Sequence, residues 1–195
     1  PAGLGFLKSK EIGVSYGILS FDRTFNYLGF VSPLKPNAGF ALGVLQSGFR
    51  ESDVRTATGE TTGEKIQDVQ YAVFLGFAIR IDDKFSMGIT PKLIYSRVFD
   101  VSASSVGVDL GMMYKPDRRL TLGLAIKEIG QSLKYSRDAT GFGEEATKDK
   151  LPTVTKFGAA YDQPLNGTFK NILIVSDLEL NSAQSSKMHF GIEAN

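Results

Sequence analysis

The chain of 195 residues contains no cysteine, no tryptophan and only one histidine. Without cysteine it cannot be a disulfide scaffold or hold a thiolate-bound metal, and a single histidine argues against a zinc site. It also lacks the run of about 18 apolar residues that a transmembrane helix requires. The net charge is only +1, which does not suggest a nucleic-acid-binding surface. We therefore expect no metal, no cofactor and no nucleic-acid partner.

The residue combinations that carry enzymatic chemistry are missing as well. Asp82-Asp83 and Glu144-Glu145 are adjacent acidic pairs, but neighbours on an extended chain point to opposite faces and make poor acid–base pairs. The loop at 140–145 has glycines without the lysine and Ser/Thr of a phosphate-binding loop. The single histidine gives no basis for a Ser-His-Asp arrangement. We predict no catalytic residues and a protein that is not an enzyme.

Residues 66–100 instead show a long alternation of side-chain character. Apolar and aromatic residues occupy almost every odd position, and small, polar or charged residues occupy most even positions. Because side chains of a strand alternate between its faces, this pattern predicts two strands with one apolar and one polar face. A three-residue turn at 82–84 would set Ile81 opposite Phe85, so that apolar positions pair across the hairpin.

Aromatic residues bound the apolar face of these strands and of the strand that follows. We expect five of them to face lipid or its boundary with water: Tyr71, Phe77, Phe85, Tyr95 and Tyr114. Membrane-spanning strands of about 9–11 residues carry aromatics at these boundaries, whereas soluble strands average about 5–6 residues. A soluble or surface-exposed β-sandwich binding module, whose inner faces are equally apolar, is the alternative that the residues leave open.

The same alternation recurs along the chain and predicts about ten antiparallel strands. Short connections such as 82–84 and 115–119 alternate with the longer ones, and we expect exposed loops at 50–65 and 131–150. Outer-membrane barrels likewise place short periplasmic turns at one end and longer extracellular loops at the other. The prediction is therefore an all-β, antiparallel up-and-down transmembrane β-barrel forming one domain over 1–195, with those two loops extracellular.

The polar face of the strands would line the lumen of such a barrel. Its charged residues are Asp68, Arg80, Lys92, Asp109, Lys127, Asp177 and Glu179. Because an unpaired buried charge is costly, we expect them to pair across the lumen or contact water. They would form either a solvated lining or a polar track for a substrate headgroup. Pro91, on the apolar face, cannot donate to the ladder and predicts a kink or bulge.

Two stretches resemble a known family. Pro1-Ala2-Gly3 resembles the Asn-Pro-Ala-Gly segment of FadL-type outer-membrane transporters and their PorV/PorQ-like relatives in type IX secretion. Residues 107–130 (GVDLGMMYKPDRRLTLGLAIKEIG) resemble a hairpin typical of the PorV-like branch. This resemblance implies a fourteen-stranded barrel whose N-terminal segment, here residues 1–8, lies in the lumen like a hatch.

The resemblance also implies a place and a role. The place would be the outer membrane of a Gram-negative cell, in contact with lipids and lipopolysaccharide. The role would be transport of hydrophobic small molecules or protein secretion together with secretion-system proteins. The family's leading Asn is missing and the chain ends on Asn195 rather than an aromatic residue, so we expect a fragment of a longer barrel.

Overall fold

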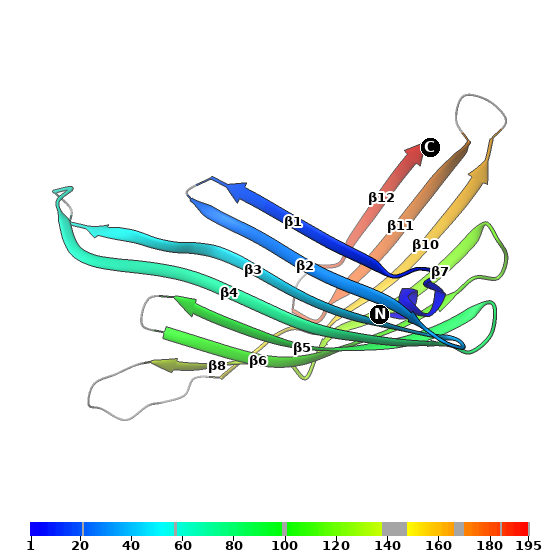
Figure 1. Ribbon diagram of the computed structural model, residues 1–195, viewed down its shortest axis with the longest axis horizontal. Helices are drawn as coiled ribbons and strands as arrows, with labels where there is room; N and C mark the ends of the chain where they lie inside the picture. The colour runs from blue at the N-terminus through cyan, green and yellow to red at the C-terminus, as the bar shows by residue number, and fades with distance from the viewer. Residues whose placement is uncertain are drawn as a thin grey trace.

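The computed structural model shows one large antiparallel sheet and one short helix (Figure 1). It describes residues 1–20, 22–56, 58–98, 101–137, 148–165, 170–183 and 185–194. The helix, η1 (Ala2–Phe6), is a 3-10 helix at the start of the chain. Within the described ranges no helix is long and apolar enough to cross a membrane.

The sheet has twelve strands, which follow one another along the chain. They are β1 (Glu11–Leu19), β2 (Arg23–Leu34), β3 (Ala38–Arg55), β4 (Thr61–Arg80), β5 (Phe85–Val98), β6 (Val101–Tyr114), β7 (Leu120–Ile129), β8 (Ser132–Arg137), β9 (Lys148–Lys150), β10 (Val154–Pro164), β11 (Asn171–Asn181) and β12 (Lys187–Ala194). Ten of them pair in the order β1-β2-β3-β4-β5-β6-β7-β10-β11-β12, and β8 and β9 lie off this path. The predicted all-β, antiparallel up-and-down arrangement is confirmed.

The sheet is open in this structure. Among the described strands, β1 pairs only with β2, and β12 pairs only with β11. Strand β6 pairs with β7 along one stretch and with β8 along another, so β7 and β8 behave as one strand that is broken between them. The structure therefore establishes an up-and-down meander of strands, and the two edge strands are not paired with each other in it.

The central hairpin has the register that the alternation predicted. Tyr71 lies opposite Tyr95, and the amide of Ile81 donates to the carbonyl of Phe85 at 2.9 Å across the turn. The β4–β5 pairing lapses between Phe74–Lys92 and Phe77–Ile89, beside Pro91, without a register shift. Strand β6 pairs continuously with β5 past this proline, so the structure shows an interrupted ladder there and no bulge.

The two faces of the sheet differ sharply in chemistry. We call the face that η1 contacts the inner face and the opposite one the outer face; Figure 1 shows η1 lying against one side of the sheet. Large apolar side chains on the outer face are exposed, such as Phe77 at 45% and Ile12 at 73%. Of the described apolar residues, only Ala2, Ala78 and Ala103 are buried. The apolar side chains therefore form an exposed surface instead of a core.

The predicted loop at 50–65 is wrong in large part. Strand β3 continues to Arg55 and β4 begins at Thr61, so only residues 56–60 connect them. The hairpin extends beyond its neighbours (Figure 1), and its ladder tolerates register shifts between Phe49 and Arg55. Because no neighbouring strand covers this tip, its sequence carries none of the alternation that marks a strand packed within a sheet.

The predicted loop at 131–150 is also shorter than expected. Strand β8 occupies Ser132–Arg137, and β9 occupies Lys148–Lys150 and pairs with it. These short strands are held by backbone hydrogen bonds to β6 and to each other, which polar sequences form as readily as apolar ones. The part of the prediction over 138–147 lies outside the described residues.

Candidate functional site on the inner face

A row of small residues on the inner face forms the seat of η1. Gly39, Ala78, Gly88 and Gly111 lie side by side on β3, β4, β5 and β6. A Cβ on Gly39 would lie 2.0 Å from the carbonyl oxygen of Leu4, and one on Gly88 would lie 2.8 Å from the carbonyl carbon of Pro1. Only glycine lets two backbones approach this closely, so the glycines at 39 and 88 allow η1 to lie directly on the sheet.

Polar contacts fix the helix on this seat. The hydroxyl of Ser86, a fully buried residue, lies 2.8 Å from the carbonyl oxygen of Ala2 and 3.0 Å from that of Ile79, both of which can accept its hydrogen bond. At the other end of η1, the ammonium of Lys115 lies 4.2 Å from the centre of the Phe6 ring, a cation–π distance. The N-terminal segment thus packs against one face of the sheet, and its place in a barrel lumen stays a prediction.

The three residues of the N-terminal motif take different parts in this contact. Pro1 and Ala2 lie over Gly88 and Gly111, and Ala2 is buried. Gly3 is exposed, with Met113 as the nearest side chain to the position its Cβ would take. The sequence reasoning identified the segment but missed its seat. The signal was present, because glycine recurs on several strands at the positions that alternate with the apolar side chains.

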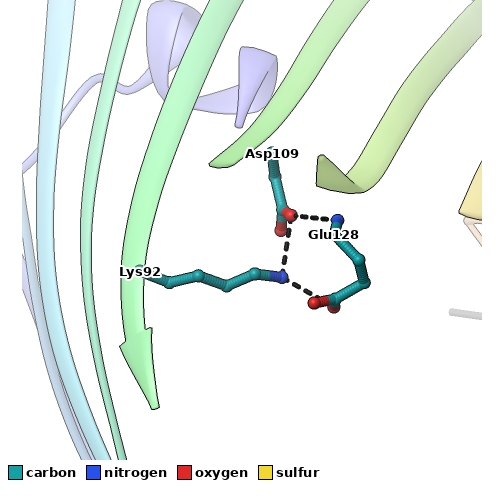
Figure 2. Close-up of polar contacts among 3 residues, drawn as sticks. All are labelled: Lys92, Asp109 and Glu128. Atoms are coloured by element: carbon teal, nitrogen blue, oxygen red, sulfur yellow. Dashed lines mark hydrogen bonds and ion pairs between the residues drawn. The ribbon is translucent and has the colours of Figure 1, made fainter. Parts of the chain in front are cut away.

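An ion cluster lies farther along the inner face, where β5, β6 and β7 meet (Figure 2). The ammonium of Lys92 lies 2.7 Å from a carboxylate oxygen of Asp109 and 2.7 Å from one of Glu128. The backbone amide of Glu128 donates to the same Asp109 oxygen at 3.0 Å. The Lys92 and Asp109 side chains are only 12% and 11% exposed, so they interact in a partly desolvated setting. We call these three residues the Lys92 cluster.

Glu128 joins the cluster because β7 contains an irregularity. The β6–β7 register shifts between Val108 and Leu110, and Glu128 adopts a φ of 61°, which is uncommon for a residue other than glycine. Strict alternation from Leu120 would place Glu128 among the outward apolar residues, and the sequence reasoning therefore missed it. A charged residue in an apolar position, two residues before Gly130, was the available signal.

Beside the cluster lie buried polar groups without partners. Gln131 is fully buried, and neither its amide oxygen nor its amide nitrogen has a hydrogen-bond partner. It packs over Gly107, the residue opposite Lys92, and the buried hydroxyl of Ser105 is also unpartnered. Buried polar groups are normally satisfied, so these atoms have hydrogen-bonding capacity for water or a polar group of a ligand.

A hollow separates part of η1 from the inner face. It has a volume of about 370 Å³ and is lined by Pro1, Gly3, Leu4, Ala41, Phe74, Gly76 and Thr90. Phe74 stacks on Tyr27 with ring centres 6.1 Å apart and lies directly opposite Lys92. Thr90 lies opposite Asp109. The hollow therefore places an apolar floor next to the Lys92 cluster, an arrangement suited to an amphipathic molecule.

The other charged residues predicted for the polar face do not join this cluster. Glu179 pairs with Lys156 on the neighbouring strand at 2.6 Å, and exposed Asp177 lies opposite Gly158. Half-buried Asp68 has one carboxylate oxygen without a partner. The Lys92–Asp109 and Lys156–Glu179 pairs join neighbouring strands, and the Lys92–Glu128 pair reaches from β5 past β6 to β7. Because the sheet is open, pairing across a lumen stays a prediction. Adjacent strands are about 5 Å apart, which favours the short connection.

The two remaining predicted residues also lie away from the cluster's contacts. Half-buried Arg80 lies near the other end of the face, where its amide donates to Asn37 and its carbonyl accepts from the Asn37 side chain. Half-buried Lys127 precedes Glu128 and pairs in register with Val154 on β10. Of the seven predicted residues, Lys92 and Asp109 are the two that the structure brings together at an ion-pair distance.

The five aromatic residues predicted to face lipid lie on the outer face. Tyr71 and Tyr95 form one cross-strand pair, and Phe85 and Tyr114 form another toward the opposite end of the strands. Phe77, Tyr71, Tyr95 and Tyr114 are exposed, and Phe85 is half-buried. The aromatic pairs thus stand at two levels along the strands, with Phe77 and aliphatic side chains between them.

The described part of the chain holds no group of three or more His, Cys, Asp or Glu residues that could bind a metal ion. No protein-family model and no curated protein matches this chain.

Proposed function

We propose that this chain forms the wall of an outer-membrane β-barrel of the FadL-like and PorV-like class, with η1 as an internal plug. The observation that carries the proposal is the apolar band on the outer face. It runs for eleven residues from Tyr71 on β4 to Ile81, just after the end of β4, and for eleven on β5, from Phe85 to Tyr95. At about 3.3 Å per residue and a tilt of about 40°, it spans about 25 Å, the height of a barrel's apolar band.

Burial supports the same proposal. A soluble domain of this length buries most of its apolar side chains, whereas here the inner face is the covered one and the outer face is exposed. A β-sandwich needs a second sheet over its apolar face, and the described residues form a single sheet. Lipid is the solvent in which this distribution is favourable.

Closure of the barrel belongs to the proposal too. In lipid the free edges of β1 and β12 would leave backbone groups unsatisfied, at several kcal/mol each. Ten strands lie on the pairing path, and with an even number the two edge strands run antiparallel, as closure requires. We propose that these edges are paired in the membrane, either with each other or with further strands.

Two roles follow from the class. The hairpin at 107–130 favours the PorV-like branch and a part in protein secretion at the cell surface. The hollow beside the Lys92 cluster favours the FadL-like alternative, in which a hydrophobic small molecule with a polar headgroup passes along the inner face. Either role uses the same barrel, so the barrel is tested first.

Heat-modifiability on a denaturing gel tests the barrel. The purified chain is refolded in detergent and run with and without boiling, and far-ultraviolet circular dichroism is recorded with and without detergent. The proposal expects a compact, faster-migrating band in the unboiled sample and strand signal that depends on detergent. A chain that is folded and monodisperse in buffer alone would overturn it.

A further inference from the structure

The outer face carries a groove that neither proposed role uses. Two cross-strand rows line it: Met87, Met112 and Leu124 form one, and Ile89, Leu110 and Ile126 form the next. Its volume is about 360 Å³, within the range of about 300–1,000 Å³ typical of small-molecule sites. Methionine is flexible, so the first row can adapt to the shape of an alkyl chain.

Basic side chains lie directly beyond one end of this groove. The aromatic pair Phe85–Tyr114 comes first along the strands, and the 82–84 and 115–119 turns follow, joined by a hydrogen bond of 2.7 Å from the Lys115 amide to the Lys84 carbonyl. Arg118 and Arg119 are exposed and take part in none of the ion pairs seen among the described residues.

Two acidic residues of these turns accept hydrogen bonds from backbone amides of the same turns. One carboxylate oxygen of Asp82 accepts the backbone amides of Lys84 and Phe85, and one of Asp117 accepts those of Arg119 and Leu120. Asp83 is exposed and is the remaining acidic group of the two turns. The two turns therefore set exposed basic side chains beside exposed carboxylates, and Arg118 and Arg119 offer two neighbouring guanidinium groups to solvent.

From this order along the strands we infer a site for one anionic glycerophospholipid, with an acyl chain in the groove and the phosphate on Arg118 and Arg119. Guanidinium groups bind phosphate oxygens in a two-pronged geometry, and an aromatic pair at the junction suits the boundary between headgroup and chain. The inference rests on the proposed membrane location and adds the identity of a bound lipid and its position.

Lipid binding to the detergent-folded chain tests the inference. Dilauroyl phosphatidylglycerol is titrated and counted by native mass spectrometry, with dilauroyl phosphatidylcholine as the matched zwitterionic lipid and glycerol phosphate as the headgroup alone. We expect phosphatidylglycerol to bind at least about tenfold more tightly than phosphatidylcholine, since each basic side chain near a membrane surface contributes about fivefold. Glycerol phosphate should bind far more weakly, because it lacks the chain.

Two variants divide the site into its parts. Arg118→Ser with Arg119→Ser should remove the preference for phosphatidylglycerol, whereas Lys148→Ser with Lys150→Ser, on exposed β9, should leave it unchanged. Leu124→Trp should fill the groove and weaken both lipids.

The matched control for the groove is Leu180→Trp, an exchange at an exposed leucine on β11, outside the groove lining. Equal affinity for the two lipids, equal losses in a variant and its control, or binding of glycerol phosphate as tight as that of the lipid would overturn the inference. The gel shift on boiling, run on the same samples, separates loss of the barrel from loss of the site.

Discussion

The ammonium of Lys92 on β5 lies 2.7 Å from a carboxylate oxygen of Asp109 on β6, and the two residues are diagonal neighbours on the inner face. Gly107, which has no side chain, lies directly opposite Lys92, so the lysine can reach Asp109 and Glu128 together. This contact ties three strands at the point where β7 breaks from its ladder. It is the strongest electrostatic feature of the candidate site.

Removing the lysine should therefore destabilise the fold strongly. Lys92→Met leaves two carboxylates partly buried without their cation, and breaking a buried ion pair costs about 3–5 kcal/mol. Lys156→Met, which breaks the more exposed pair with Glu179, should cost much less, because solvent screens that pair. Chemical unfolding of the detergent-folded variants measures both. Equal losses of unfolding free energy in the two variants would show that the Lys92 cluster stabilises the fold no more than the exposed pair does.

The positive φ of Glu128 gives a second prediction. Glu128→Gly should be more stable than Glu128→Ala by about 1 kcal/mol, because both lose the ion pair and only alanine retains the backbone strain. At neighbouring Lys127 the order should reverse, with alanine better by about 0.5–1 kcal/mol. The same unfolding assay compares the four variants. If alanine is the better residue at both positions, the left-handed conformation of Glu128 is wrong.

The seat of η1 gives a third prediction. Gly39→Ala brings a Cβ to 2.0 Å from the Leu4 carbonyl, so the helix must shift, at a cost of about 1–3 kcal/mol for overpacking. Gly123→Ala is the matched control, because its Cβ would have no heavy atom nearer than 4.0 Å. A cysteine placed at buried Ala2 reports the shift.

Maleimide labelling of that cysteine should become several-fold faster with Gly39→Ala and stay unchanged with Gly123→Ala. The chain has no cysteine of its own, so the signal comes from this one site. An unchanged rate with Gly39→Ala would mean that the row of small residues does not hold the helix.

The 115–119 turn gives a prediction about pH. Hydrogen bonds from the backbone amides of Leu120 and Arg119 lower the pKa of the exposed Asp117 carboxyl below its usual value. A carboxyl with a lowered folded pKa stabilises the fold above its unfolded pKa of about 3.9, and this stabilisation is lost as pH falls through the lower folded value.

Asp117→Asn keeps an oxygen that can accept the two amides but removes the titration. Its unfolding midpoint should therefore depend less on pH below about 4 than that of the parent chain. Asp117→Ala removes both the charge and the acceptor, and it should also lower the midpoint at neutral pH. A parent and Asn variant with the same acid profile would contradict the assigned role of Asp117.

The sequence predicted those parts of the fold that side-chain alternation controls. The pairing of Tyr71 with Tyr95 followed from period-two patterning together with a three-residue turn at 82–84, because a shift of one residue would exchange the two faces. The extended β3–β4 tip did not follow, because backbone hydrogen bonds hold strands there without an apolar face. Glu128 was missed because a bulge breaks the alternation that would have placed it.

The candidate site was predicted only in pieces. Lys92 and Asp109 were both assigned to the polar face, but their contact depends on which strands are neighbours and on the missing side chain at Gly107. The N-terminal segment was placed by resemblance, while its seat depends on Gly39 and Gly88 coming into one row. Such relationships arise from register between strands distant in sequence.

The central claim is that the outer face contacts lipid, and a cysteine scan along β4 tests it most directly. Single cysteines at the outward positions Val73, Leu75 and Phe77 and at the inward positions Ala72 and Phe74 are labelled with bimane in phosphatidylcholine vesicles. Brominated acyl chains should quench the three outward probes strongly and the two inward probes weakly. Quenching that is uniform along the strand, or absent at the outward positions, would contradict the account.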